Sequence, residues 1–404
     1  MDRHRERIDG LDALRGFALL GILLINIQVF AGYGFLPSEA KLALSGSGFD
    51  AELKSLLDIT ARGRFYSLFS LLFGYSFVML AHRPGSGGEH EHLRRMAGLL
   101  VIGLAHSILL WPWDILLLYA LVGLLLTPFL RLPPRTLLLS GIGLLLAVGV
   151  LRGAWLYLEL GVRQRELAAL LLEKQLPHLA GGSPAAIIEA NLRLTPGVFI
   201  ERLEALRPLR VLAMFLLGAA AARLHLAERA AGHVGLLRGL AVLGLGAGLA
   251  LGVAQVALAP IAPLRQVVFL TAETLSAPLV AVGYAAAFTL WWRGDGPWSG
   301  RTRAFLAPAG RMALTNYLLQ SAVCVPLFYG FGGGWFAEVS LAHLSLFALG
   351  LFTLQVSASH LWLARFRQGP CEWLWRWQYK GSRPPLRHAA DTTPPAGLTA
   401  VRRR

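Results

Sequence analysis

A histidine and an aspartate flank a short turn in the string GLAHSILLWPWDILLLYALVG. His106 lies near the end of a long apolar segment, and Asp114 follows the tripeptide Trp-Pro-Trp at the start of the next one. A carboxylate that orients an imidazole is a common way to build a general base. The alternative is a structural histidine satisfied by any neighbour, with Asp114 capping the second helix. We take the catalytic interpretation forward, with His106 as the base and Asp114 as its partner.

Charged side chains also lie within apolar segments, where an ionisable group is costly and often functional. Asp12 and Arg15 open the first apolar segment, and Arg15 suits an anion such as phosphate. The alternative is an acidic first turn and an arginine that extends to the membrane surface. Arg64 suits an anionic ligand or lipid headgroup, or else anchors its helix at the interface. Glu273 is either functional or paired with a residue such as Arg152.

Two asparagines, a glutamine and an arginine complete the candidate binding residues. Asn26 lies eleven residues after Arg15, about 16 Å along a helix. A buried asparagine either joins helices or contacts a substrate. Asn316 and Gln320, in the string GRMALTNYLLQS, share one helix face and form a polar stripe that lines a cavity or joins helices. Arg311 begins that string and is a second candidate for an anionic group.

The sequence gives little reason to expect a metal or a disulfide. The histidines at 82, 90 and 92 stand in a glycine-rich stretch that offers no fixed scaffold for a metal ion. Cys324 lies in an apolar run and Cys371 in a basic one, which argues against a disulfide. We therefore expect no metal cofactor.

The composition indicates a membrane protein. Of the 404 residues, 55% are hydrophobic and only 15% are charged, whereas soluble domains carry about 25% charged residues. This excludes a water-soluble globule and a disordered chain. The net charge of +15 comes largely from short segments between apolar runs, which is typical of cytoplasmic loops rather than of nucleic-acid binding. The expected partners are the lipid bilayer and a small-molecule substrate, with no nucleic acid.

The apolar runs predict an all-α, polytopic membrane protein with about ten transmembrane helices. With the N-terminus in the cytoplasm, the cytoplasmic segments hold 24 of the 38 Lys and Arg residues, which favours an N-in/C-in topology in a bacterial inner membrane. The predicted spans are 14–32, 64–81, 93–111, 113–131, 137–160, 208–227, 236–258, 267–293, 303–330 and 339–364.

The chain divides into a helical bundle and a tail. We assign residues 1–380 to the transmembrane bundle, with two long outer loops at 33–63 and 161–207. The second loop has helical patterning and is expected to form amphipathic helices on or in the outer face. Residues 381–404 are rich in Pro, Arg and Thr, which predicts a basic, disordered cytoplasmic tail.

Five spaced strings resemble the YeiB family, bacterial membrane proteins of unknown function. They are RIDGLDALRGFALLGILLINI, GRFYSLFSLLFGYSF, GLAHSILLWPWDILLLYALVG, GRMALTNYLLQS and GPCEWLWRWQY. The resemblance covers nearly the whole chain outside the tail. Trp113 departs from it, because a glycine is expected before the aspartate.

The first string is also similar to two wider groups, the heparan-alpha-glucosaminide N-acetyltransferases and the acyltransferase-three family. That resemblance implies a ten-helix core that passes an acyl group from cytoplasmic acyl-CoA to an acceptor, with Arg15 and Asn26 at motif positions. The catalytic histidines of both groups are missing: segment 27–63 contains no histidine, and Asn26 replaces the histidine of the acyltransferase-three helix. His106 is the candidate that takes over.

These observations leave three functional hypotheses. The first is a membrane-embedded acyltransferase that uses acyl-CoA as co-substrate and moves its acyl group, in the simplest case acetyl, to a small or envelope-side acceptor. The alternative is a transporter or exporter of a small polar or anionic solute. In that case the buried charged side chains bind the solute or couple its transport to another process. The third is a lipid-binding or scaffolding protein. A homodimer is compatible with all three.

Overall fold

We describe residues 2–45, 48–81, 88–157, 162–257, 263–293 and 296–388 of a computed structural model. Within these ranges all the regular elements are helices, and the only β pairing is an isolated bridge between Phe366 and Arg387. The predicted all-α fold is therefore confirmed. The elements of the first half are α1 (Asp2–Phe30), η1 (Tyr33–Phe35), α2 (Ser38–Ser45), α3 (Phe49–Thr60), α4 (Arg64–Ala81), α5 (Gly88–Leu109), α6 (Leu116–Leu125), η2 (Thr127–Arg131), α7 (Pro134–Tyr157) and α8 (Val162–Gly181).

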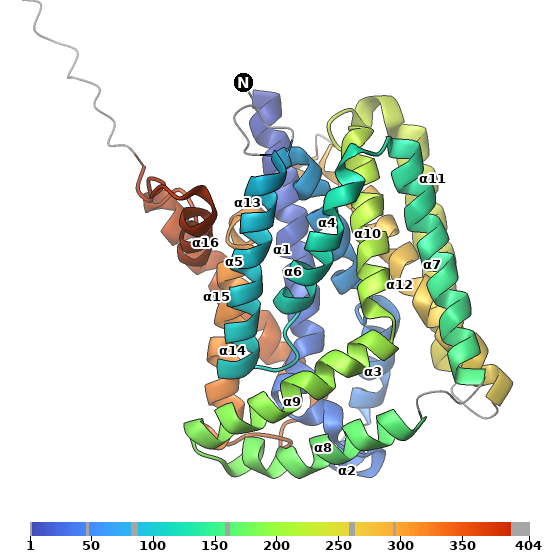
Figure 1. Cartoon of the computed structure of the whole chain (residues 1–404), viewed down its shortest axis with the longest axis vertical. Helices are drawn as coiled ribbons and strands as arrows, with labels where there is room; N and C mark the ends of the chain where they lie inside the picture. Colours follow the sequence, from blue (N-terminus) through green and yellow to red (C-terminus); the bar gives the residue numbers. More distant parts are fainter. Residues whose placement is uncertain are drawn as a thin grey trace, which may run out of the picture.

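The second half continues the bundle and ends on a short helix that packs against α5 and α14, at the same end of the molecule as the N-terminus (Figure 1). Its elements are α9 (Pro184–Glu204), α10 (Arg207–Arg223), η3 (Ala230–His233), α11 (Val234–Ala257), α12 (Pro263–Trp292), α13 (Pro297–Arg311), α14 (Ala313–Phe328), α15 (Leu341–Arg365) and α16 (Pro370–Lys380).

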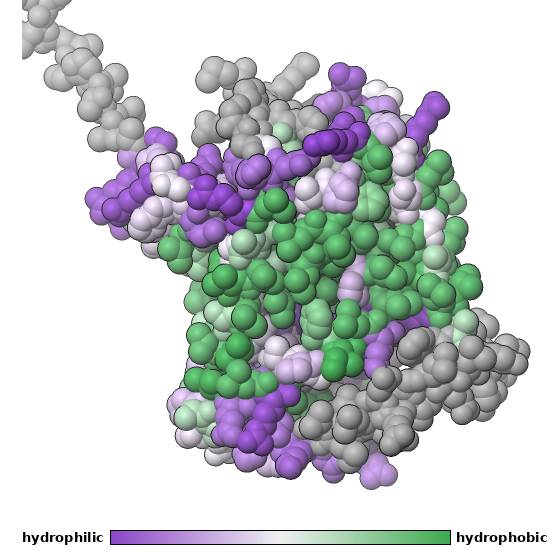
Figure 2. Space-filling view, viewed as in Figure 1, coloured by the Kyte–Doolittle hydropathy of each residue, from purple (hydrophilic) through white to green (hydrophobic). Residues whose placement is uncertain are grey.

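The surface of the bundle is that of a membrane protein. Figure 2 shows an apolar band around the middle of the visible face, with polar surfaces above and below it. Large apolar side chains such as Val150, Val242, Leu346 and Leu354 are about 70% exposed on the long helices. Such exposure would be costly in water, but it is expected where lipid replaces water.

Six helical segments of the described chain are long and apolar enough to span a membrane, or seven if the bent pair α9 and α10 counts as one. The predicted count of ten is thus not reached by this criterion. Two of the ten segments are interrupted: 113–131 forms the ten-residue α6 and a 3₁₀ turn, and 303–330 divides at Met312 into α13 and α14. This criterion uses length and composition, and it leaves out shorter helices that pack within a bundle. The count of ten spans and the N-in/C-in topology therefore stay predictions.

Helix α1 lies at the centre of the bundle and contacts α4, α13, α14 and α15. Its closest neighbour is α13, because a Cβ atom added at Gly310 would lie 1.7 Å from the Asp12 carbonyl oxygen. Only glycine permits this approach. The crossing places Arg15 of α1 and Arg311 at the end of α13 beside the same cavity.

Two helices cross the end of the bundle opposite the N-terminus. Helices α8 and α9 lie there, at the same end of the molecule as α2 (Figure 1). They fall within 161–207, where the sequence predicts outer-face helices, and the helical part of that prediction is confirmed. Helix α9 then bends by 64° into α10. At the other end, residues 381–388 of the predicted tail fold back, and Arg367 donates a 2.8 Å hydrogen bond to the Leu386 carbonyl. Residues 389–404 lie outside the described residues.

Candidate functional site

His106 and Asp114 are in direct contact across the turn that joins α5 and α6. The Nδ1 atom of His106 lies 2.8 Å from the Oδ1 atom of Asp114, and both side chains are almost completely buried. Asp114 also accepts a 2.8 Å hydrogen bond from the Leu117 amide. The two sequence interpretations of Asp114, a helix cap and a histidine partner, are therefore both realised by one carboxylate, through different oxygens.

The tight packing of α5 against α6 allows this contact. Gly103 lies one turn before His106, and a Cβ atom added there would lie 2.4 Å from the Leu117 nitrogen. The turn itself is anchored by tryptophan: Trp111 is buried, with its ring 4.2 Å from that of Phe30 at the end of α1. The end of α1 therefore covers Trp111.

Two further helices hold Asp114. The Tyr317 hydroxyl of α14 donates to Asp114 Oδ1 at 3.2 Å, and Arg202 of α9 donates to the Asp114 carbonyl oxygen. Asn191, also on α9, donates to the carbonyl oxygens of Ile108 and Leu110. Asp114 Oδ1 accepts a hydrogen bond from Tyr317 and is also the acceptor in its contact with His106, so the proton of that contact lies on His106 Nδ1. The Nε2 atom of His106, which is buried without a partner, then carries the lone pair.

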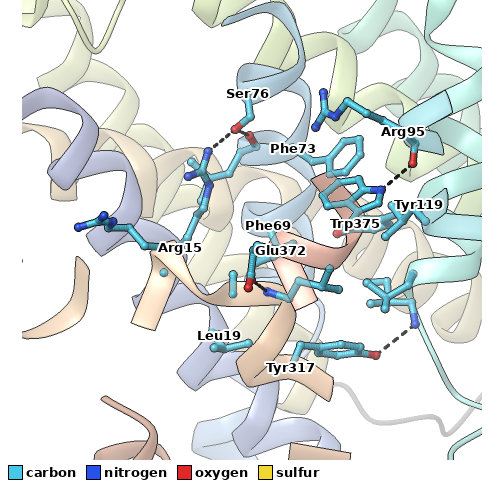
Figure 3. A pocket seen from close by; sticks show the side chains of 18 of the residues that line it. Arg15, Leu19, Phe69, Phe73, Ser76, Arg95, Tyr119, Tyr317, Glu372 and Trp375 are labelled. Atoms are coloured by element: carbon cyan, nitrogen blue, oxygen red, sulfur yellow. Dashed lines mark hydrogen bonds between the residues drawn. The ribbon is translucent and has the colours of Figure 1, made fainter. Parts of the chain in front are cut away.

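A cavity of about 240 Å³ runs from the N-terminal end of the bundle towards this pair (Figure 3). Its middle is apolar, and its far end is formed by Ile115, Leu116 and the ring of Tyr317. His106 and Asp114 are not part of its wall. The apolar side chains between the two ends are Leu19, Ile22, Phe69, Leu72, Phe73 and Leu99.

Four arginines line the opposite end of the cavity. Arg311 and Arg376 are exposed, whereas Arg15 and Arg95 are partly buried. Arg15 pairs with the buried Asp12 and donates a 2.5 Å hydrogen bond to Ser76 on α4. Asp12 balances one of these charges, so the opening keeps an excess of positive charge suited to an anion with several charges.

Helix α16 forms part of the cavity wall and is fixed to α14 and α5 by hydrogen bonds. Glu372 accepts hydrogen bonds from the Leu314 and Thr315 amides, at 2.7 and 3.1 Å, and from the Thr315 hydroxyl. These amides belong to the first turn of α14, where a carboxylate is favoured. Burial nevertheless raises the pKa of the Glu372 carboxyl, and the hydrogen bonds from Thr315 and Leu314 only partly oppose it. Trp375 donates a 2.8 Å hydrogen bond to the Arg95 carbonyl oxygen.

Comparison with known proteins places this architecture in a family. The chain is 34% identical to the uncharacterized protein YeiB of Escherichia coli (strain K12) over 399 residues, covering 92% of this chain and 96% of that one. It is 32% identical to the uncharacterized protein YxaH of Bacillus subtilis (strain 168), covering 92% and 94%. The chain belongs to the YeiB family.

A family model described as "Protein of unknown function (DUF418)" matches residues 221–381, which include α13 to α16. An uncharacterized 39.9 kDa protein of Bacillus acidopullulyticus is 28% identical over 377 residues. No solved structure matches the chain. The predicted family is therefore confirmed, and the relatives carry no assigned activity.

Within this member of the YeiB family, the predicted polar stripe joins helices. The Asn316 amide donates to the Ala309 carbonyl oxygen at 3.1 Å and to the Ser359 hydroxyl at 3.0 Å. Gln320 donates to Gln355 on α15 at 3.1 Å. None of these side chains lines the cavity. Of the two alternatives for Asn316 and Gln320, the contacts favour the joining of helices.

Other candidate residues lie away from the cavity. Asn26 is partly buried on α1, beyond the cavity-lining part of that helix. Arg64 is buried, and donates to the carbonyl oxygens of Asp58 and Arg62 and to the Ser276 hydroxyl. In the structure Arg64 therefore links α4 to α12, and these protein groups take the hydrogen bonds that a ligand or a lipid headgroup would otherwise accept. Glu273 lies on α12, and its side chain is outside the described residues.

Several residues of the site were not among the predicted ones. Arg95, Arg202 and Glu372 each lie in a stretch where charge is common, so charge alone could not single them out. Tyr317 stands beside the predicted Asn316, but nothing in its spacing points to Asp114, which is about two hundred residues earlier. Among the described residues, no group of three or more His, Cys, Asp or Glu side chains could hold a metal ion.

Proposed function

We propose that the chain is a membrane-embedded acyltransferase that draws an acyl group from acyl-CoA, most simply acetyl-CoA, in a bacterial inner membrane. The observation that carries this proposal is the cavity. It connects four arginines at one end of the cavity with Tyr317 at the other, and Tyr317 contacts the buried His106–Asp114 pair.

The dimensions of the site match a long ligand with charge at one end. Arg95 and His106 lie eleven residues apart on α5, about 16 Å along the helix axis. An acyl-CoA carries its phosphates at one end and its thioester at the other, with an uncharged arm between them. We place the phosphates at the exposed Arg311 and Arg376 with Arg15 and Arg95, and the arm in the apolar cavity. The cavity volume of about 240 Å³ suits the arm, while the nucleotide stays at the opening.

The chemistry assigned to the pair is general base catalysis. His106 Nε2 takes a proton from the hydroxyl or amine of an acceptor, whose oxygen or nitrogen attacks the thioester carbon. The carbon–sulfur bond breaks, and the CoA thiolate leaves and takes the proton back from His106. Asp114 stabilises the imidazolium that forms between these steps. The acceptor approaches from the end of the bundle that α8 and α9 cross.

Binding of acetyl-CoA to the detergent-purified protein tests this proposal by calorimetry and thermal shift. We expect saturable binding that weakens about tenfold or more in Arg15→Ala, because a charge-assisted hydrogen bond to phosphate is lost. Arg193→Ala is the matched control: Arg193 is exposed on α9 and pairs with Glu189, away from the cavity. Absence of binding at millimolar acetyl-CoA, or equal binding by Arg15→Ala, would contradict the proposal.

A transporter is the second candidate, and the broken helices favour it. The chain divides at Met312 between α13 and α14, directly at the cavity, and bends by 64° between α9 and α10. Discontinuous helices surround the substrate sites of many transporters. In that case proteoliposomes would move a small anion without acyl-CoA, and the His106→Ala variant would lose this flux. Flux without acetyl-CoA binding would replace the first proposal.

A further inference from the structure

Tyr317 separates the cavity from the catalytic pair. Its ring forms part of the cavity wall, whereas His106 and Asp114 do not reach the cavity. The centroids of the Tyr317 and His106 rings are only 5.5 Å apart. In Figure 3, Tyr317 lies at the opposite end of the cavity from Ser76 and Arg95. A ligand in the cavity therefore meets Tyr317 before it can meet His106.

The Tyr317 side chain is held in this closed position by two hydrogen bonds at its hydroxyl. The hydroxyl donates to Asp114 Oδ1 and accepts from the Ile115 amide, each at 3.2 Å. The first distance is long for an O–H···O hydrogen bond, and the second lies at the upper end of the range for an N–H···O hydrogen bond. The same Asp114 oxygen accepts the shorter hydrogen bond of His106. When Tyr317 leaves, Asp114 keeps its contacts with His106 and the Leu117 amide, so the catalytic pair survives the movement.

The opening of the cavity and Tyr317 are connected through one short stretch of α14. Glu372 of α16 binds the first turn of this helix at Leu314 and Thr315. Tyr317 follows within one turn, and the helix begins only after the break at Met312. A ligand that shifts α16 at the opening therefore acts on the helical turn that carries Tyr317.

We propose that Tyr317 is a gate: its side chain closes the deep end of the cavity and must swing aside before a cavity ligand reaches His106 Nε2. That this ligand is an acyl thioester rests on the proposed function. The gate itself concerns only access to His106. Tyr317 is accordingly a positioning residue, which holds Asp114 when closed and admits the ligand when open.

Labelling with diethylpyrocarbonate tests the gate without acyl-CoA. This reagent carbethoxylates the unprotonated nitrogen of accessible histidines, and mass spectrometry of the digested protein gives a separate rate for each one. His225, whose side chain is 52% exposed, is the internal reference. We expect His106 in the unaltered protein to react at least about tenfold more slowly than His225.

Variants at Tyr317 separate the ring from the hydroxyl. Tyr317→Ala removes the barrier, and we expect His106 labelling to become about tenfold faster. Tyr317→Phe keeps the ring and loses the hydroxyl, so its rate should stay well below that of the Ala variant. Tyr317→Leu, which suits a buried helix, serves if the Ala variant does not fold. Cys324→Ala is the matched control, since Cys324 is buried on the same helix and away from the cavity.

The outcomes distinguish the gate from the proposed function. If a folded Tyr317→Ala or Tyr317→Leu variant labels His106 at the same rate as the unaltered protein does, the gate is overturned, whether or not acetyl-CoA binds. Labelling of His106 as fast as His225 in the unaltered protein would overturn it as well. Faster labelling in the variants together with no acetyl-CoA binding would retain the gate and reject the acyltransferase.

Discussion

The Nδ1 atom of His106 lies 2.8 Å from Asp114 Oδ1, and the two residues belong to consecutive helices joined by one tight turn. Their contact is fixed from three sides. Leu117 donates to the second carboxylate oxygen, Tyr317 to the first, and Arg202 to the backbone of Asp114. A pair held in this way has one ring nitrogen free to react, and this arrangement leads to the following predictions.

Removal of the base should stop transfer but not binding. We expect His106→Ala to abolish release of CoA thiol from acetyl-CoA in the presence of hydroxyl and amine acceptors, and Asp114→Asn to lower it by about 10²–10⁴-fold. Both variants should bind acetyl-CoA with nearly unaltered affinity, because neither side chain lines the cavity. Full activity of a folded His106→Ala variant would remove His106 from the mechanism.

Gly103 should tolerate no side chain. Gly103→Ala places a methyl group 2.4 Å from the Leu117 nitrogen, which forces α5 and α6 apart and lengthens the contact between His106 and Asp114. We expect a loss of about 1–3 kcal/mol in the free energy of unfolding and a loss of activity. The control is Gly143→Ala on α7, where a Cβ atom meets nothing within 4 Å. Thermal unfolding in detergent compares the two, and equal melting temperatures would contradict the prediction.

Glu372 should make stability depend on pH. Because burial raises its pKa in the folded protein above 4.5, the ordinary value, the folded state binds this proton more tightly than the unfolded state does. Its contribution to stability is therefore complete below about pH 4.5 and is lost as the pH rises through the folded pKa.

The comparison with Glu372→Gln isolates this group. Relative to the variant, the free energy of unfolding of the unaltered protein should fall as the pH rises from 4.5 towards neutrality, by at most about 1.4 kcal/mol per pH unit. The melting temperature should fall with it. A difference that stays constant over this range would show that the carboxyl does not titrate there.

Gln320 should affect stability and not binding. Its amide donates to Gln355 on the neighbouring helix, and hydrogen bonds of this kind contribute about 0.6 kcal/mol in membrane proteins. We expect Gln320→Leu to lower the melting temperature slightly and to bind acetyl-CoA as the unaltered protein does. A tenfold loss of affinity, about 1.4 kcal/mol, would instead support the interpretation that the polar stripe lines the ligand site.

The sequence predicts the local features of this protein well, for physical reasons. Apolar runs form helices because lipid leaves no other way to satisfy backbone groups. The short turn predicts that the helices carrying His106 and Asp114 are adjacent, and the structure shows that the two side chains touch. Arg15 is a candidate from sequence alone because a charged side chain in an apolar helix is costly, and in the structure it lines the cavity. Each of these inferences needs only neighbouring residues.

The tertiary structure alone decides which polar groups meet. The residue type and sequence position of Asn316 and Arg64 are compatible with two roles, binding a ligand or joining helices. Only the packing of α13, α15 and α12 shows that their hydrogen bonds join helices. Tyr317 reaches Asp114, and Glu372 reaches Thr315, through contacts between distant parts of the chain. No local pattern encodes such pairings, because they depend on how every helix between them packs. The sequence therefore determines a helical membrane protein and brings His106 and Asp114 close along the chain, and the packing of its helices decides where the cavity runs and which residues form its walls.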